Sequence, residues 1–375
     1  MGVVLVFEPA SNIHWMKDVV QFPNTLAQFA YGTNATLITR PNHKQEELEK
    51  HIQVVHLGTA LQENFLKFEY SDFSRIITFN VWYLNGCRKA AELGELLILY
   101  PWYGDFFEGA KIFKLKRWLR FKKASVVLKS DGLFKQKSES KSDLKTKFRD
   151  FFKYFFIDRM ICENQEIFLQ MKINQGHLLN KLVFIPNCPL DIYHTTEFIA
   201  YKERPRNFLF VGRVSDIEKG ADLLLATWLR IFLKVKAWKL QLVGPCSEDF
   251  KQQWKQKIDE ADADFSVQWF PTASPQELLN YYNSARVVVC SSRKESGPIV
   301  LSEAVFSRCA FIGTAVGEIP DLLKGMPGLV EDVERLGEEM LLFASNDNLA
   351  MEQAKKLREK IGDRKWSEQV KKILK

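Results

Sequence analysis

The chain has 375 residues, 46% of them hydrophobic and 26% charged, which is the composition of a globular protein with a large core. Because this length exceeds what one hydrophobic core usually serves, we expect two domains. The formal charge of +7 is modest, no apolar run reaches the ~18 residues of a transmembrane helix, and the six cysteines form no Cys-x-x-Cys pair. We therefore expect a cytoplasmic protein with reduced thiols.

Short apolar runs alternate with helical patterns through the first half of the chain. Strands are predicted at residues 3–7, 35–39, 53–56, 75–79, 96–100, 125–128, 159–162 and 182–185. This alternation predicts an α/β domain with a parallel sheet, which we assign to residues 1–190.

Prolines and polar residues separate the two halves and predict a linker at 191–206. A second α/β domain is expected at 207–348. Its predicted strands are 207–211, 239–243, 266–269, 286–290 and 310–312, and its clearest helices are 221–233, 250–261 and 275–283. The remaining residues, 349–375, are predicted as helix with a break at Gly362.

Two cations lie in the loop that follows the strand at 207–211. Arg213 comes directly after Gly212, and Lys219 precedes the next helix. A loop between a strand and a helix lies at the carboxyl edge of the sheet, where open α/β folds bind ligands. Two cations there could neutralise a diphosphate as its bond to a sugar breaks. The alternative is a pair of solvated loop cations.

Two glutamates, Glu295 and Glu303, bracket the loop and helix that follow the strand at 286–290. Pro298 suits the first position of a helix, and the free amides of a helix N-terminus bind phosphate. One anion site flanked by two hydroxyl-binding carboxylates predicts a site for a sugar, a diphosphate and a ribose. The alternative is a solvated helix face.

Taken together, these motifs resemble those of a known family. The matching pieces are 211–213 with 219–220, 242–245, 281–289, the Glu295/Glu303 pair, and Gly313 followed by 317–321. The segment from about 208 to 323 resembles the donor domain of retaining nucleotide-sugar glycosyltransferases of family four. The resemblance implies the GT-B fold: two Rossmann-like domains facing a cleft, with the C-terminal helices of 349–375 packing back on the N-terminal domain.

The resemblance also implies roles for individual residues. Arg213 and Lys219 would hold the donor diphosphate, Glu295 would contact the transferred sugar, and Glu303 would bind the ribose hydroxyls. Pro298 stands where many members have glycine, and proline has no N–H to donate. The remaining donor contacts expected on this basis are Gly212, Gly244, Phe270, Ser296, Gly297, Pro298 and the backbone amides of Ile299 and Val300.

The first half of the chain, which would bind the acceptor, resembles the family only in the layout of its predicted strands and helices. The loop after the first strand offers Asn12 and His14 as acceptor contacts, although His14 is equally typical of a surface or packing histidine. The counterpart of the family's acceptor-side base is Asp131, with Asp105 as a second candidate. The alternative for both aspartates is a turn-forming role next to glycine.

We expect no metal and no other cofactor. Asp262-Ala263-Asp264 matches the Asp-x-Asp pattern that binds Mg²⁺ in the other major glycosyltransferase fold. Here it follows an amphipathic helix without an apolar strand leading into it, so a solvated helix end is expected. Arg213 and Lys219 can supply the positive charge instead.

Residues 111–156 combine many lysines and arginines with large apolar side chains. This composition predicts peripheral contact with an anionic membrane. The alternative is structural, with the apolar side chains covering the sheet and the lysines facing solvent. No recognised nucleic-acid motif accompanies the charge, so we expect no nucleic-acid partner.

We therefore predict a retaining glycosyltransferase that moves a sugar, such as a hexose, from a nucleotide sugar to a hydroxyl acceptor. The resemblance implies a lipid-linked or cell-surface glycan acceptor at the cytoplasmic membrane face, in polysaccharide or glycolipid biosynthesis. The alternatives are a sugar-nucleotide epimerase or phosphorylase with the same fold, or a non-catalytic scaffold. A dinucleotide-dependent oxidoreductase is disfavoured because no Gly-x-Gly-x-x-Gly follows a strand.

Overall fold

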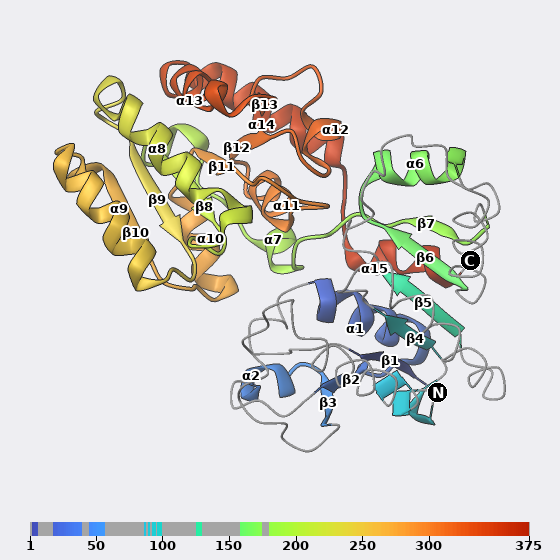
Figure 1. Cartoon of the computed structure of the whole chain (residues 1–375). Helices are drawn as coiled ribbons and strands as arrows, with labels where there is room; N and C mark the ends of the chain where they lie inside the picture. The colour runs from blue at the N-terminus through green and yellow to red at the C-terminus, as the bar shows by residue number, and fades with distance from the viewer. Residues whose placement is uncertain are drawn as a thin grey trace, which may run out of the picture. The chain divides into compact units, whose positions relative to one another are not determined.

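The computed structural model describes residues 2–6, 18–39, 45–56, 86–87, 89–90, 92–94, 96–99, 125–129, 158–174 and 180–374. The chain divides into two compact units. The first comprises Met1–Pro186 with Trp366–Lys375, and the second comprises Asn187–Lys365. Each unit is built on its own parallel sheet (Figure 1).

The first unit contains a seven-stranded sheet of order β3-β2-β1-β4-β5-β6-β7. Its strands are β1 (Val3–Val6), β2 (Thr36–Thr39), β3 (Gln53–His56), β4 (Leu96–Leu99), β5 (Ser125–Lys129), β6 (Arg159–Cys162) and β7 (Leu182–Phe184). The order runs outward from β1 in both directions, as in Rossmann-like folds, with β1 pairing parallel to both β2 and β4. The predicted strand at 75–79 lies outside the described residues.

Helix α1 (Asp18–Tyr31) packs on β1. The other described helices of the first part of this unit are α2 (Glu46–Glu49) and α6 (Gln165–Asn174). The end of the chain also belongs here: α15 (Trp366–Gln369) packs against α1, with the rings of Phe22 and Trp366 5.8 Å apart, and α16 (Lys371–Leu374) follows. Only Trp366–Lys375 groups with the first unit, whereas the segment predicted to pack there begins at residue 349.

The second unit contains a six-stranded parallel sheet of order β10-β9-β8-β11-β12-β13. Its strands are β8 (Asn207–Val211), β9 (Lys239–Val243), β10 (Val267–Phe270), β11 (Val287–Cys290), β12 (Ala310–Thr314) and β13 (Leu329–Val330). The first five match the predicted strands to within two residues at each end. The two-residue β13 was not predicted, because it is too short to produce a period of its own.

Helices and short 3-10 turns connect these strands. They are α7 (Ile192–Thr195), η4 (Tyr201–Glu203), η5 (Ile217–Lys219), α8 (Ala221–Ile231), η6 (Phe232–Lys234), α9 (Glu248–Glu260), η7 (Asp264–Ser266), α10 (Pro275–Asn283), α11 (Ile299–Phe306), α12 (Ile319–Leu323), η8 (Val333–Arg335), α13 (Leu336–Ser345) and α14 (Asp347–Ile361). Capping residues define where some of these helices begin. At α10, Ser274 and Glu277 form a capping box, and Pro275 lies in the first turn.

The core of the second unit lies between its sheet and α8. Phe208 on β8 stacks on Trp238 with ring centroids 4.6 Å apart, and it meets Trp228 of α8 edge-on at 5.9 Å. Trp228 is fully buried and donates its indole N–H to Ser266 Oγ at 3.0 Å, so no polar atom of this ring is left unpaired. This packing fixes the position of β8, whose carboxyl end leads into the loop that carries the predicted cations.

The stretch predicted as a linker, 191–206, is packed as part of the second unit. Arg204 is only 2% exposed, and its guanidinium donates to the carbonyl oxygens of Ser307 at 2.8 Å and Ala285 at 3.2 Å. A buried guanidinium with several carbonyl partners holds this stretch against the sheet. Among the described residues of the whole chain, no helix is both long and apolar enough to cross a bilayer.

Candidate functional site

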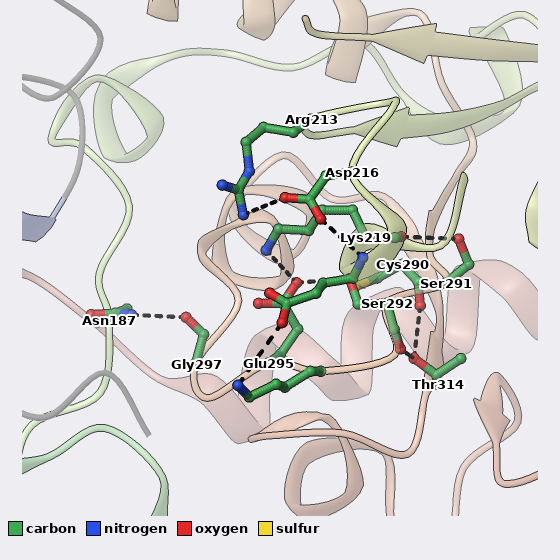
Figure 2. A network of polar contacts seen from close by, with 12 residues as sticks. Asn187, Arg213, Asp216, Lys219, Cys290, Ser291, Ser292, Glu295, Gly297 and Thr314 are labelled. Atoms are coloured by element: carbon green, nitrogen blue, oxygen red, sulfur yellow. Dashed lines mark hydrogen bonds and ion pairs between the residues drawn. The ribbon is translucent and has the colours of Figure 1, made fainter. Parts of the chain in front are cut away.

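The strand order of the second unit reverses between β8 and β11, which lie side by side with Phe208 paired to Val287. The loops that leave the carboxyl ends of these two strands therefore meet at one edge of the sheet. In doubly wound sheets this reversal is where ligands bind. Figure 2 shows the side chains that the two loops bring together there.

The loop after β8, residues 212–220, consists of two consecutive turns. The amide of Asp216 donates to Arg213 O at 3.1 Å, and the amide of Lys219 donates to Asp216 O at 2.9 Å. These turns place Arg213, Asp216 and Lys219 at three-residue intervals along one loop. The start of the loop is held by the neighbouring strand, because the Gly212 amide donates to Val243 O at 3.0 Å.

Gly220 joins this loop to the loop after β11. Its φ is +68°, in the left-handed region, and a Cβ on it would lie 1.9 Å from Ser291 O. No side chain fits in that space, so glycine is required there. Ser291 Oγ in turn donates to Gly220 O at 2.8 Å. The two loops are therefore in direct backbone contact beside Lys219.

Lys219 and Glu295, which the sequence predicts to act on the same ligand, form an ion pair. Lys219 Nζ lies 2.7 Å from Glu295 Oε1, and Ser292 Oγ donates to the same oxygen at 2.7 Å (Figure 2). The Glu295 side chain is 12% exposed and that of Lys219 is 26% exposed. Two donors on one oxygen hold the Glu295 carboxylate in a defined orientation at the edge of the sheet.

Arg213 is also paired, but within its own loop. Its Nη2 lies 2.8 Å from Asp216 Oδ2, and its side chain is 57% exposed. The two predicted cations thus project from the same loop, with Asp216 between them in Figure 2. The structure brings Arg213, Lys219 and Glu295 to the same edge of the sheet, and their contacts with a donor stay predictions.

Arg293 is part of this site, although sequence reasoning missed it. Its guanidinium donates to both carboxylate oxygens of Asp222, at 2.7 and 2.6 Å, and to Ile217 O at 2.6 Å. Its amide donates to Glu218 O at 2.7 Å. Burial raises the pKa of the Asp222 carboxyl, but the hydrogen bonds and the charge of Arg293 outweigh burial and leave this pKa lowered. Arg293 therefore clamps the loop after β11 to the loop that carries Lys219.

Helix α11 begins at the same edge, with Pro298 as its N-cap. The amides of Ile299 and Val300 lie in its first turn, where helical amides have no partner within the helix. Asn187 Nδ2 donates to Gly297 O at 2.8 Å, and Ser302 Oγ donates to Asn187 O at 3.2 Å. These bonds fix the entry into the helix, so the predicted phosphate-binding amides have a defined position.

Glu303 lies one turn further along α11 and is turned into the core. Its side chain is 7% exposed, and its Oε2 accepts a hydrogen bond from Tyr282 Oη at 2.7 Å. Burial raises the pKa of Glu303 to about 7, although Tyr282 and, more weakly, Tyr193 act in the opposite direction. Its contact with ribose hydroxyls stays a prediction, and the buried tyrosine is a partner that the sequence did not indicate.

Gly244 and Phe270 lie at the carboxyl ends of β9 and β10. The Gly244 amide donates to Phe270 O at 3.2 Å, and the Phe270 ring lies 4.9 Å from that of Tyr281. Both residues are thus at the same edge of the sheet as the cation loop. Their contacts with the donor, which the resemblance implies, stay predictions.

The Asp-x-Asp pattern lies at the other edge. Asp262 lies two residues after the end of α9 and has a positive φ of 51°, and Asp264 begins η7, the turn directly before β10. An amino-terminal strand end faces away from the ligand edge. Among the described residues, no group of three or more His, Cys, Asp or Glu side chains could hold a metal ion.

The acceptor-side predictions lie outside the described residues. This holds for Asn12, His14, Asp105 and Asp131, and for 111–156 apart from β5. Their roles stay predictions.

Comparison with known proteins finds a family model that matches most of the second unit, and solved structures that share the fold of the chain. Residues 205–347 match the model of the family described as Glycosyl transferases group 1. No curated protein sequence matches the chain. These 143 residues include both loops of the site, from Arg213 to Glu303.

Three solved structures illustrate the fold. HepE of Anabaena, solved with UDP and glucose, aligns with 100% of this chain and 99% of its own, with a TM-score of 0.69 and 12% identity. Sucrose-phosphate synthase of Thermosynechococcus elongatus aligns over 99% and 96%, with a TM-score of 0.69 and 18% identity. WaaG, a glycosyltransferase involved in lipopolysaccharide biosynthesis, aligns over 99% and 98%, with a TM-score of 0.66 and 12% identity. The chain therefore has the GT-B fold, with two Rossmann-like domains, as predicted.

Proposed function

We propose that this protein is a retaining glycosyltransferase that transfers a sugar from a nucleotide-diphosphate donor to a hydroxyl acceptor. The observation that carries the proposal is the pairing of Lys219 Nζ with Glu295 Oε1 at 2.7 Å, where the strand order reverses, with Arg213 on the same loop as Lys219. A cation and a carboxylate side by side at that position suit a ligand in which a phosphate is joined to a sugar.

The donor end of the reaction uses these residues directly. As the bond between the anomeric carbon and the phosphate oxygen breaks, negative charge grows on the diphosphate. Arg213, Lys219 and the amides of Ile299 and Val300 would stabilise that charge, and Glu295 would accept hydrogen bonds from sugar hydroxyls. Two cations can supply this charge without a metal, so we propose that no metal is required.

Retention requires the acceptor to attack from the face that the diphosphate leaves. The acceptor oxygen forms the new bond to the anomeric carbon, and its proton passes either to the departing phosphate oxygen or to an acceptor-side base. Catalysis then depends mainly on holding the acceptor close and stabilising the leaving group. Asp131 and Asp105 remain the candidates for an acceptor-side base, and Asn12 and His14 remain candidate acceptor contacts.

The comparisons suggest which donor and acceptor to test first. HepE is recorded in complexes with UDP and with UDP-glucose, so UDP-hexoses are the first donors to try. WaaG acts in lipopolysaccharide biosynthesis, which supports a lipid-linked or cell-surface glycan as acceptor. The basic and aromatic composition of 111–156 supports peripheral contact with the cytoplasmic face of a membrane.

Two measurements test the proposal. Titration calorimetry with UDP and GDP should show binding of at least one of them. A transfer assay with radiolabelled nucleotide sugars, with and without lipid acceptors, should then show product that Arg213→Ala and Lys219→Ala each reduce by about 10²- to 10³-fold while the protein stays folded. Near-normal rates in both variants, or binding of neither nucleotide, would contradict the proposal.

A further inference from the structure

A carboxylate stands between the two proposed diphosphate-binding cations. Asp216 follows Arg213 by one turn and precedes Lys219 by another, and each turn is closed by a backbone hydrogen bond. One oxygen of Asp216 accepts from the Glu218 amide at 2.9 Å, and the other lies 2.8 Å from Arg213 Nη2. The same carboxylate thus caps the loop and binds the guanidinium.

The transfer chemistry has no evident use for this carboxylate. Glu295, the other acid at the site, has a place beside the sugar, whereas Asp216 lies on the loop assigned to the phosphates. A diphosphate that binds Arg213 accepts the guanidinium hydrogen bonds that Asp216 now accepts. It also brings negative charge within a few ångströms of Asp216, and like charges so close repel. Asp216 should therefore oppose diphosphate binding.

We propose that Asp216 is a positioning residue that acts through Arg213 as a competing counter-ion. It lowers the affinity of the site for the diphosphate, so that the nucleoside diphosphate leaves readily after transfer. Before the donor binds, Asp216 also holds the Arg213 guanidinium in place through their ion pair. This inference rests on the proposed function, because it assumes that Arg213 binds the donor diphosphate.

Asp216→Asn tests the inference, because the amide oxygen of asparagine can still accept from the Glu218 amide while the negative charge is lost. The dissociation constants of UDP, GDP and inorganic pyrophosphate are measured by titration calorimetry. We expect them to fall about two- to fivefold, the range that an exposed ion pair supports. In the transfer assay the donor KM should fall and kcat should not rise. The gain in affinity should shrink at about 0.5 M salt, because exposed charges are then screened.

Two further variants separate this role from others. Asp259→Asn removes one negative charge on the exposed face of α9 and should leave all three dissociation constants unchanged. In an Arg213→Ala background, Asp216→Asn should no longer tighten binding, because the residue through which Asp216 acts is gone.

Each other result overturns the inference. Weaker or unchanged binding in Asp216→Asn would mean that the carboxylate only shapes the loop. Tighter binding that persists in the Arg213→Ala background would mean a general electrostatic effect without Arg213. If the wild-type protein binds none of the three probes, the proposed function fails together with the inference, whereas wild-type binding that Asp216→Asn does not tighten defeats the inference alone.

Discussion

Arg293 and Asp222 lie 71 positions apart in the chain and form a two-point ion pair, with donor–acceptor distances of 2.7 and 2.6 Å. The guanidinium also binds Ile217 O, so one side chain holds the loop after β8 against the loop after β11. Lys219 and Glu295 belong to these two loops. The clamp therefore sets the distance between the two groups that we assign to phosphate and sugar.

Replacing Arg293 by lysine should loosen the clamp without changing the charge. Lysine cannot reproduce the two parallel bonds of a guanidinium. We expect Arg293→Lys to raise the dissociation constant of UDP about threefold and to lower the melting temperature by about 2–4 °C, equivalent to ~1 kcal/mol. Arg335→Lys, at an exposed ion pair, is the matched control and should change neither quantity. Unchanged UDP binding in Arg293→Lys would show that the clamp does not position the site.

Glu295 should contact the transferred sugar and not the phosphates. Glu295→Gln keeps an acceptor for Lys219 and Ser292 but removes the charge. We expect transfer from a nucleotide sugar to fall about 10- to 100-fold, a loss of ~1.4–2.7 kcal/mol in transition-state stabilisation. UDP, which lacks the transferred sugar that this residue would contact, should bind as well as before or better. If UDP affinity instead fell as much as the transfer rate, Glu295 would have to contact the diphosphate.

The buried carboxyl of Glu303 should make stability depend on pH. Because its pKa is raised from 4.5 to about 7, the folded protein holds this proton at a pH where the unfolded chain has lost it. The associated stability is complete below pH 4.5 and is lost as the pH rises to about 7, by ~3 kcal/mol in all. Glu303→Gln, which cannot ionise, should show no such loss of stability as the pH rises. Urea unfolding of both proteins between pH 4.5 and 8 measures the difference, and parallel pH curves would contradict the assignment.

Gly220 should tolerate no side chain, for a steric reason beyond its left-handed backbone. Gly220→Ala brings a methyl group to 1.9 Å from Ser291 O, whereas Gly32→Ala, at the same φ of +68°, meets nothing within 4 Å. Gly32→Ala should cost only the backbone strain of a positive φ, ~1–2 kcal/mol. Gly220→Ala should cost more and should also weaken UDP binding, because the two site loops must separate. Thermal unfolding and calorimetry of the pair test this, and equal losses of stability with unchanged UDP binding would contradict it.

Much of the second unit could be predicted from the sequence, because its signals are local. Apolar runs such as 207–211 and 287–290 are buried on both faces of a parallel sheet, and Ser274 with Glu277 starts a helix through its own backbone. Because these strands are parallel, their carboxyl ends lie at the same edge of the sheet. Arg213, Lys219 and Glu295 could therefore be assigned to one site before any distance was known.

The order of strands and helices, and the loops that carry the ionisable groups, follow from the amino-acid sequence alone, since spacing and capping act between near neighbours. Which of these groups contact one another depends on the tertiary structure. The pairing of Lys219 with Glu295 across 76 positions, the clamp of Arg293 on Asp222, and the burial of Glu303 against Tyr282 depend on how segments distant in the chain pack together. Packing of that kind leaves no period or spacing in the sequence, because the partners meet only after the sheet has formed.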